Sequence, residues 1–172
     1  YWLTGYFNLV KILEITLNNG YDKRTEKQIG LETGYAPDYK SFKDLIAAFR
    51  TQVDYFADIK IRGNNVISKT FENYLPVPFL SLLVEDCIKN GKDYNCGGAR
   101  YNTTYVQGVG LGSLTDILTS IRFNIYEKKN YSWDELTKAL ESDFEGYESI
   151  RYDLVYNTPK YGNDDDYADN QA

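Results

Sequence analysis

Apolar side chains recur every three or four residues along most of the chain, which is the spacing of one face of an α-helix. This pattern predicts six helices. They are expected near residues 6–18, 42–74, 79–89, 114–125, 132–140 and 147–154. Only residues 103–109 alternate as a short strand does. The pattern therefore indicates a mainly α chain.

Local signals mark where two of these helices begin and end. Asn19-Gly20 supplies a left-handed stop for the first helix. Ser41 is expected to cap the second helix, with Asp44 as the returning carboxylate three residues later. Between them, residues 20–40 form a long polar connection, and a loop of that length is often functional or lies over another domain.

A second capping pair is expected at the fifth helix. Ser132 and Glu135 have the spacing of a capping box. The apolar positions that follow, Leu136, Ala139 and Leu140, are expected to face inward.

Composition narrows the class of protein. The chain has 172 residues, 42% of them hydrophobic and 26% charged, which is ordinary for a folded domain. The net charge of -6 argues against a nucleic-acid or anionic-membrane partner, because both attract basic surfaces. No apolar run reaches the roughly 20 residues that span a bilayer, and no signal-peptide pattern is present. A cytoplasmic location is therefore expected.

Two residue types are missing altogether. The chain has no histidine, which removes the commonest general base and every Ser/His or Cys/His arrangement. It also has no methionine, so Tyr1 is not a translation start. Because the first and last residues both run into helical patterns, we expect the sequence to be a piece of a longer polypeptide.

The stretch "CGGARYNTTYVQGVGLGSLTDIL" invites two interpretations. Gly108, Gly110 and Gly112 could cradle a phosphate before a helix, as in dinucleotide-binding proteins. Their G-x-G-x-G spacing differs from G-x-G-x-x-G, and the strand before them is weak. The alternative is a loop in which glycine lets one backbone segment approach another.

The cysteines and a run of acidic residues are the other candidate sites. Cys96 could be a nucleophile if a nearby cation such as Arg100 lowered its pKa, but the chain has no histidine to act as its base, and a small loop residue is the alternative. Cys87 lies on the apolar side of a predicted helix and is expected to be buried. Asp164–Asp166 and Asp169 could hold a metal or could mark the first turn of a helix.

Several blocks of the chain, in order, are similar to one family. They are "GYFNLVKILEITLNNGYD", "QIGLETG", "RGNN", "PVPFLSLLVEDCI", "GKDYNCGGARYNTTYVQGVGLGSLTDIL", "DFEGYE" and "PKYGNDDDYAD". On these blocks the chain resembles the glycyl radical enzymes of the pyruvate formate-lyase-like superfamily, over essentially its whole length. Within that group it is similar to the dehydratase and carbon–nitrogen lyase branch.

The resemblance implies a fold. It implies a mainly α fragment of an α/β protein, part of the ten-stranded β/α barrel, with one or two short strands. Residues 1–172 would be a single partial domain from the C-terminal half of that barrel domain. The family's thiyl cysteine motif, similar to Gly-Cys-Val-Glu, and its radical loop, similar to Arg-Val-x-Gly-Tyr, do not occur in the chain. They are expected upstream and downstream of it, so the isolated segment is expected to be inactive.

The resemblance also implies an activity. A lyase of this kind uses an organic radical under anaerobic conditions to eliminate water or an amine from a small hydroxylated substrate. Dehydration of trans-4-hydroxy-L-proline is the preferred expectation. Glycerol or diol dehydration, choline trimethylamine-lyase activity and formate acetyltransferase activity are the alternatives. A non-catalytic helical interaction module is the alternative from another class.

Further expectations concern cofactors and partners. The resemblance implies no bound cofactor, but a glycyl radical that a radical S-adenosylmethionine activase installs. The full-length protein is expected to be a homodimer that binds a small-molecule substrate, with no nucleic-acid or membrane partner.

Candidate site residues follow from the same resemblance. In this family the segment shortly after the thiyl cysteine lines the substrate pocket, and "YWLTGYF" matches it. Thr4 and Tyr6 would contact substrate through their hydroxyls, and Trp2 would shape the pocket wall. The alternative is that all three pack at the start of the first helix. The loop that contains Gly108, Gly110 and Gly112, here called the glycine loop, would be an interior loop of the barrel region.

Overall fold

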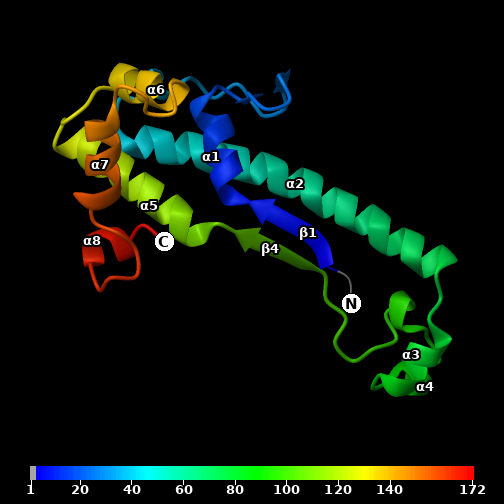
Figure 1. The fold of residues 1–172 in the computed structure, drawn as a ribbon. Helices are drawn as coiled ribbons and strands as arrows, with labels where there is room; N and C mark the ends of the chain where they lie inside the picture. The colour runs from blue at the N-terminus through cyan, green and yellow to red at the C-terminus, as the bar shows by residue number, and fades with distance from the viewer. Residues whose placement is uncertain (1–2) are drawn as a thin grey trace. The chain divides into compact units, whose positions relative to one another are not determined.

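The computed structural model describes residues 3–172, with Leu3 and Thr4 described by their backbone alone, and it is mainly α-helical (Figure 1). The chain divides into two compact units, here called the first unit (residues 1–7 and 56–107) and the second unit (residues 8–55 and 108–172). The mainly α fold class is confirmed. That residues 1–172 form a single partial domain of a longer protein stays a prediction.

Four short strands lie among the described residues, where one or two were expected. Strands β1 (Leu3–Asn8) and β4 (Tyr105–Val109) pair in a two-stranded sheet. Their arrows run in the same direction in Figure 1. Each strand leads directly into a helix, α1 (Leu9–Leu17) after β1 and α5 (Leu111–Ile121) after β4. Parallel strands followed by helices are the unit from which β/α barrels are built. Within residues 3–172 no closed barrel is seen.

Short helices make up much of the rest of the first unit. After the second half of helix α2 (Phe42–Tyr74) come α3 (Pro78–Leu83), α4 (Cys87–Asn90) and the 3₁₀ turn η2 (Tyr94–Cys96). The predicted end of α2 is confirmed. A single helix over 79–89 is wrong, because Asp86 adopts a left-handed conformation (φ 73°) that interrupts it.

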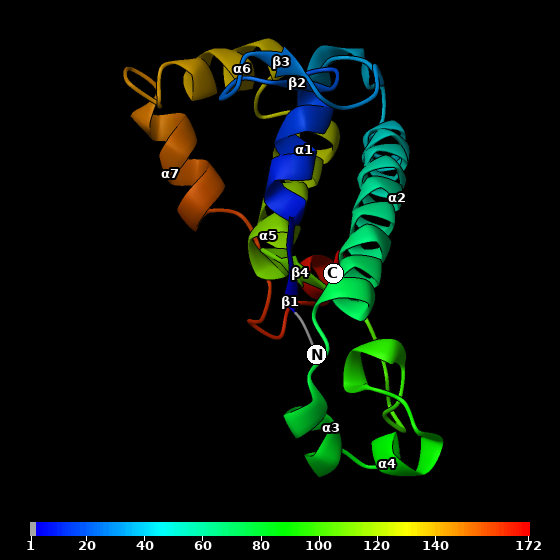
Figure 2. The same ribbon diagram turned by 90° about the vertical axis from the view of Figure 1, so that its right-hand side faces the viewer.

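The second unit is built around α1, the first half of α2, and α5. Its other elements are β2 (Tyr21–Asp22), β3 (Lys27–Gln28), the 3₁₀ turn η1 (Ala36–Asp38), the π-helical turn η3 (Arg122–Glu127), α6 (Trp133–Glu141), α7 (Glu148–Tyr156) and α8 (Asp166–Asp169). Strands β2 and β3 form a small antiparallel hairpin, which Figure 2 shows near α6. The sequence pattern did not predict this hairpin, because two-residue strands carry no alternation.

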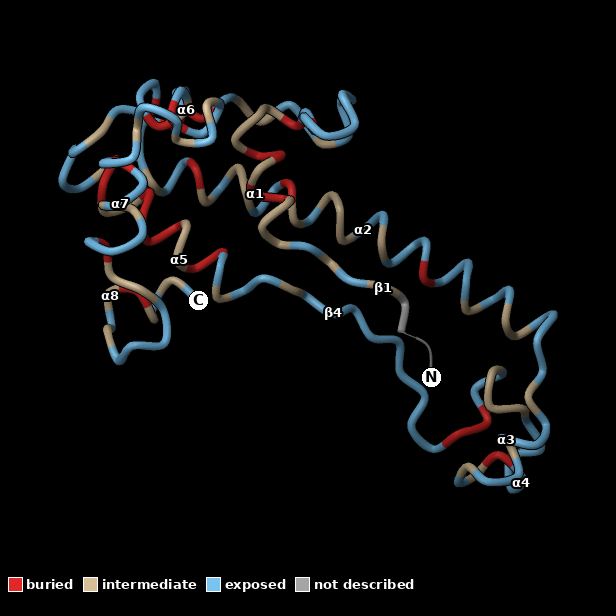
Figure 3. Tube along the Cα trace, in the orientation of Figure 1, coloured by how far each residue is buried: buried red, intermediate tan, exposed pale blue. Residues whose placement is uncertain are grey.

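The buried residues of the second unit gather on α1, α2, α5, η3 and α6 (Figure 3). They form one hydrophobic cluster in which aliphatic side chains dominate. Its buried members are Leu13, Ala36, Tyr39, Leu45, Leu114, Leu118, Ile121, Ile125, Trp133 and Leu136. Burial of such apolar surface is the main stabilising contribution to a domain of this size.

Helix α1 begins three residues later than the pattern predicts. Asn8 is its N-cap, and the Asn8 side chain accepts a hydrogen bond from the Lys11 backbone N–H at 3.1 Å. Tyr6 and Phe7 lie in β1 instead, since aromatic residues suit strands and β4 supplies a partner strand. The predicted stop at Asn19-Gly20 is confirmed, with φ of 54° and 84°.

Both predicted capping boxes are confirmed. At α2, the Ser41 N–H donates to the Asp44 carboxylate at 2.9 Å and the Asp44 N–H donates to Ser41 Oγ at 3.2 Å. Ser132 and Glu135 make the same exchange at α6. The inward position of Leu140 is wrong: its side chain is 54% exposed, because the buried face of α6 follows Trp133, Leu136 and Ala139.

A buried glutamine on α2 was not predicted. Gln52 is fully buried, and its side-chain amide accepts from the Leu31 N–H at 3.1 Å and donates to the Leu31 carbonyl at 2.6 Å. It also donates to Thr33 Oγ1 at 3.2 Å. One buried side chain thus bonds both backbone groups of Leu31 and has its own polar atoms satisfied, which ties the long connection to α2.

Candidate functional site

The three residues assigned to substrate contact fall at the start of the chain. Trp2 lies outside the described residues, and Thr4 is described only by its backbone, in β1. Tyr6 lies in β1, and 62% of its surface is exposed. Its ring therefore contributes little packing within this chain, and it does not lie at the start of a helix. The substrate role of the three residues stays a prediction.

The two-stranded sheet pairs this segment with β4. Burial alternates along β1, with Gly5 and Phe7 partly buried and Tyr6 and Asn8 exposed. Such alternation is typical of a strand with one covered face and one open face. The open face therefore carries the Tyr6 hydroxyl, a group that can both donate and accept hydrogen bonds.

The glycine loop serves close packing of backbone against side chain. Gly110 is the N-cap of α5 with φ of 85°. A Cβ at Gly110 would lie 3.0 Å from Cγ2 of Val10 on α1. The short strand expected over residues 103–109 and the helix expected after the loop are both present, as β4 and α5. The close approach to Val10 accounts for Gly110, and it supports the close-approach interpretation.

Cys96 lies in a polar depression of the first unit. The depression has a volume of about 320 Å³ and is lined by hydroxyl and amide side chains, among them Tyr94, Asn95 and Thr103. The Cys96 thiol is exposed and lies 3.7 Å from the Glu72 carbonyl oxygen. Among the described residues, no basic side chain lines the depression.

Arg100, four positions after Cys96 in the sequence, is engaged elsewhere. Arg100 donates to Asp86 at 2.9 Å and lies 3.3 Å from Glu85. The hydrogen bond from Arg100 lowers the pKa of the Asp86 carboxyl. The predicted burial of Cys87 is confirmed. Neither cysteine therefore has the surroundings of a nucleophile within the described residues.

Two aspartates of the acidic run near the end of the chain accept hydrogen bonds from backbone N–H groups. Asp165 is the N-cap of α8 and accepts from the Tyr167 N–H at 2.9 Å, which confirms a helix start here. Asp169 accepts from the Gly162 N–H at 2.7 Å. Across residues 3–172, no three histidine, cysteine or acidic side chains converge as metal ligands would. No helix in the same range is both long and apolar enough to cross a membrane.

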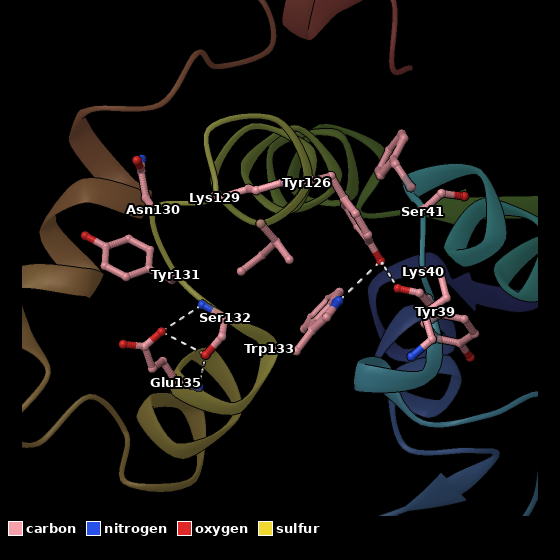
Figure 4. Close-up of a pocket in the computed structure, with 12 residues that line it drawn as sticks. Tyr39, Lys40, Ser41, Tyr126, Lys129, Asn130, Tyr131, Ser132, Trp133 and Glu135 are labelled. Atoms are coloured by element: carbon pink, nitrogen blue, oxygen red, sulfur yellow. Dashed lines mark hydrogen bonds between the residues drawn. The ribbon is translucent and has the colours of Figure 1, made fainter.

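A depression of the second unit lies where α2 and α6 begin (Figure 4). It is open and has a volume of about 720 Å³. The Tyr126 hydroxyl donates to the Tyr39 carbonyl oxygen at 3.1 Å and accepts from Trp133 Nε1 at 3.2 Å. Burial raises the pKa of Tyr126, which keeps its phenol neutral and able to donate. These polar groups are satisfied by one another, so the depression is a junction between helices.

A tyrosine–carboxylate pair ties the loop before α6 to α7. The Tyr131 hydroxyl donates to the Asp153 carboxylate. This hydrogen bond, followed by burial, raises the pKa of Tyr131 from its ordinary value of 10.0 to about 12. The same bond, with a second from Asn157, lowers the pKa of Asp153.

This pair predicts how stability depends on pH. Because the folded state raises the pKa of Tyr131, its contribution is complete below about pH 10 and is lost as pH rises to about 12. Because the folded state lowers the pKa of Asp153, that contribution is lost as pH falls through the acid range. We expect the free energy of unfolding of Tyr131→Phe to fall less than that of wild type at both acid and alkaline pH. Urea unfolding at pH 3, 7 and 11 measures it. Tyr101→Phe, at an exposed ring, is the matched control. Parallel pH curves for wild type and Tyr131→Phe would contradict the expectation.

Comparison with known proteins gives a consistent result along the chain. A family model described as pyruvate formate lyase-like matches residues 1–172. The chain is 55% identical over 169 residues to trans-4-hydroxy-L-proline dehydratase of Clostridioides difficile. That match covers 98% of this chain and 21% of the relative, so the chain spans about a fifth of the relative's length.

Solved structures agree with the sequence match. The crystal structure of hydroxyproline dehydratase from Clostridioides difficile, with trans-4-hydroxy-L-proline bound, superposes with a TM-score of 0.94 at 54% identity. It covers 97% of this chain and 21% of that chain. The glycerol-bound B12-independent glycerol dehydratase from Clostridium butyricum gives 0.89 at 38% identity, over 96% of this chain and 21% of that chain. The chain therefore belongs to the pyruvate formate lyase-like family.

Proposed function

We propose that this chain is a segment of a glycyl radical dehydratase that removes water from trans-4-hydroxy-L-proline. The proposed substrate rests on the difference in sequence identity between this chain and two of its relatives. Identity is 55% to the hydroxyproline dehydratase, against 38% to the glycerol dehydratase, over nearly the same share of the chain. Side chains that define a substrate pocket change when the substrate changes, so the nearer relative is the better guide to the substrate.

The proposed chemistry assigns this segment a supporting role. A thiyl radical on a cysteine takes a hydrogen atom from the substrate, and the hydroxyl group then leaves as water with a proton from an acid. The product radical takes the hydrogen atom back from the thiol, which restores the thiyl radical. The cysteine and glycine motifs for these steps do not occur in the 172 residues. They belong to other parts of the full-length protein, which we propose to be a cytoplasmic homodimer activated by a radical S-adenosylmethionine enzyme.

The contribution of this segment is to hold the substrate. The exposed phenol of Tyr6 is available to a ligand on the open face of β1. Thr4 and Trp2 complete the proposed contact set. In a closed site a hydroxyl can bind a substrate carboxylate or hydroxyl group, while apolar walls exclude the water that would quench a radical.

Tyr6→Phe tests this role in the activated full-length protein. Removing one hydrogen bond to a charged or polar substrate group is expected to lower kcat/KM for trans-4-hydroxy-L-proline about tenfold, which is about 1.4 kcal/mol. Tyr74→Phe, at an exposed position on α2, is the matched control and should leave kcat/KM unchanged. If Tyr6→Phe also leaves kcat/KM unchanged, Tyr6 does not bind substrate.

The interaction-module alternative rests on the apolar side chains of α3. Phe79 is 76% exposed, Leu82 and Leu83 are also exposed, and no residue of α3 is buried. An exposed apolar cluster of this kind needs a covering surface. The relatives that share this fold are about five times longer, which favours the rest of the same polypeptide as that surface. The enzyme is therefore the proposal we adopt.

A further inference from the structure

A lysine on α2 lies against the middle of the proposed substrate strand. Within the first unit, Nζ of Lys60 is 2.7 Å from the point where a Cβ of residue 5 would sit. Among described residues other than the chain neighbours of Gly5, Lys60 supplies the only atom within 4 Å of that point. The ammonium therefore fills the space that a side chain at position 5 would occupy.

The backbone conformation of Gly5 leaves room for this contact. Its φ of 91° lies in the left-handed region, which a residue with a Cβ rarely adopts. This φ lies far from that of a regular strand residue and falls within β1, next to Tyr6. The backbone conformation at Gly5 therefore affects the direction in which the strand presents Tyr6.

The side chains one helical turn from Lys60 on α2 are apolar or neutral. The residues three and four positions away from Lys60 are Phe56, Ala57, Gly63 and Asn64, and none is acidic. The neighbouring pair of Asp58 and Arg62, with 2.7 Å between carboxylate and guanidinium, shows the usual arrangement on this helix. Lys60 is partly buried and is directed at the strand instead.

An ammonium group is well suited to stabilising the backbone of a strand. It has three N–H donors, and the peptide carbonyls of a strand are acceptors. Hydrogen bonds from a charged donor are roughly twice as strong as neutral ones. A lysine held against the backbone of Gly5 can therefore stabilise one backbone conformation over its alternatives.

We infer that Lys60 is a positioning residue of the proposed site: its ammonium holds the backbone of β1 at Gly5 and so fixes the direction in which the strand presents Tyr6. The inference rests on the proposed function. Lys60 is not a catalytic residue, since it acts through the strand.

The test uses the full-length protein, activated, with Lys60→Met, Lys60→Arg and a control on the same helix, Lys69→Met. Lys69 is exposed and pairs with Glu72. Lys60→Met is expected to raise KM for trans-4-hydroxy-L-proline about tenfold with a smaller change in kcat, because a displaced strand weakens ground-state and transition-state binding alike. Lys60→Arg should restore KM to within about threefold, and Lys69→Met should match wild type.

A second measurement does not depend on the substrate. Hydrogen–deuterium exchange of the peptide covering residues 3–8 should become severalfold faster in Lys60→Met and should stay unchanged in Lys69→Met. If wild type exchanges as expected but does not turn over hydroxyproline, the substrate assignment fails while the hold of Lys60 on β1 stands. Unchanged exchange in Lys60→Met, or faster exchange with an unchanged KM in an active enzyme, would overturn the inference.

Discussion

Leu45→Ala is expected to lower the free energy of unfolding of this chain by about 2–5 kcal/mol. The Leu45 side chain is 0% exposed and belongs to the cluster that joins α1, α2 and α5 in the second unit. Removing three carbons from that site loses their burial and leaves a cavity that the neighbouring helices fill only in part. Urea unfolding followed by circular dichroism measures the change.

Leu82→Ala is the matched control for this experiment. Leu82 has the same chemistry but lies on α3 with 62% of its surface exposed. Its truncation is expected to change stability within about 0.5 kcal/mol. Equal losses for the two variants would mean that Leu45 does not lie in a packed core.

Gly110→Ala is expected to cost about 3 kcal/mol. Two effects add at this position: a residue with a Cβ costs about 1–2 kcal/mol at left-handed φ, and crowding of a packed site costs about 1–3 kcal/mol. The φ of Gly110 is 85°, and Val10 lies 3.0 Å from the added carbon. Thermal and urea unfolding of the variant give the loss directly.

Two further variants separate these effects. Gly162 has a similar φ of 82°, but nothing lies within 4 Å of a Cβ added there. Gly162→Ala should therefore show the conformational cost alone, about 1–2 kcal/mol. Val10→Ala should relieve part of the loss in Gly110→Ala, because it removes the crowded methyl groups. If Gly110→Ala and Gly162→Ala cost the same, the close approach of α1 to the glycine loop is unimportant.

Helix boundaries that depend on neighbouring residues could be predicted from the sequence. Ser132 with Glu135 is a local signal, since the cap and its returning carboxylate are three residues apart. The stop at Asn19-Gly20 and the break at Pro76 are local for the same reason. Such elements form where the pattern indicates them.

Elements that depend on distant partners could not be predicted in this way. β1 is a strand because β4, about a hundred residues later, pairs with it, and this pairing overrides the helical spacing around Tyr6. The burial of Gln52 depends on the backbone of Leu31, which no pattern on α2 reveals. Leu140 has the spacing of a buried residue, but 54% of its surface is exposed.

The candidate site divides in the same way. Thr4, Tyr6 and Trp2 were reached through family resemblance, since hydroxyl and aromatic residues in an apolar segment carry no chemical signature of their own. Lys60 lies 55 positions from Gly5, and only the fold brings the two together. The packing that accounts for Gly110 is likewise visible only in the fold, because Gly110 abuts Val10.

Turnover by the full-length protein is the measurement that tests the assignment most directly. The protein would be activated anaerobically by a radical S-adenosylmethionine enzyme, its glycyl radical counted by electron paramagnetic resonance, and its substrates compared by NMR. We expect trans-4-hydroxy-L-proline to be dehydrated with a kcat/KM far above that for glycerol or choline. A protein that carries the radical but converts glycerol or choline, and leaves hydroxyproline intact, would contradict the proposed substrate.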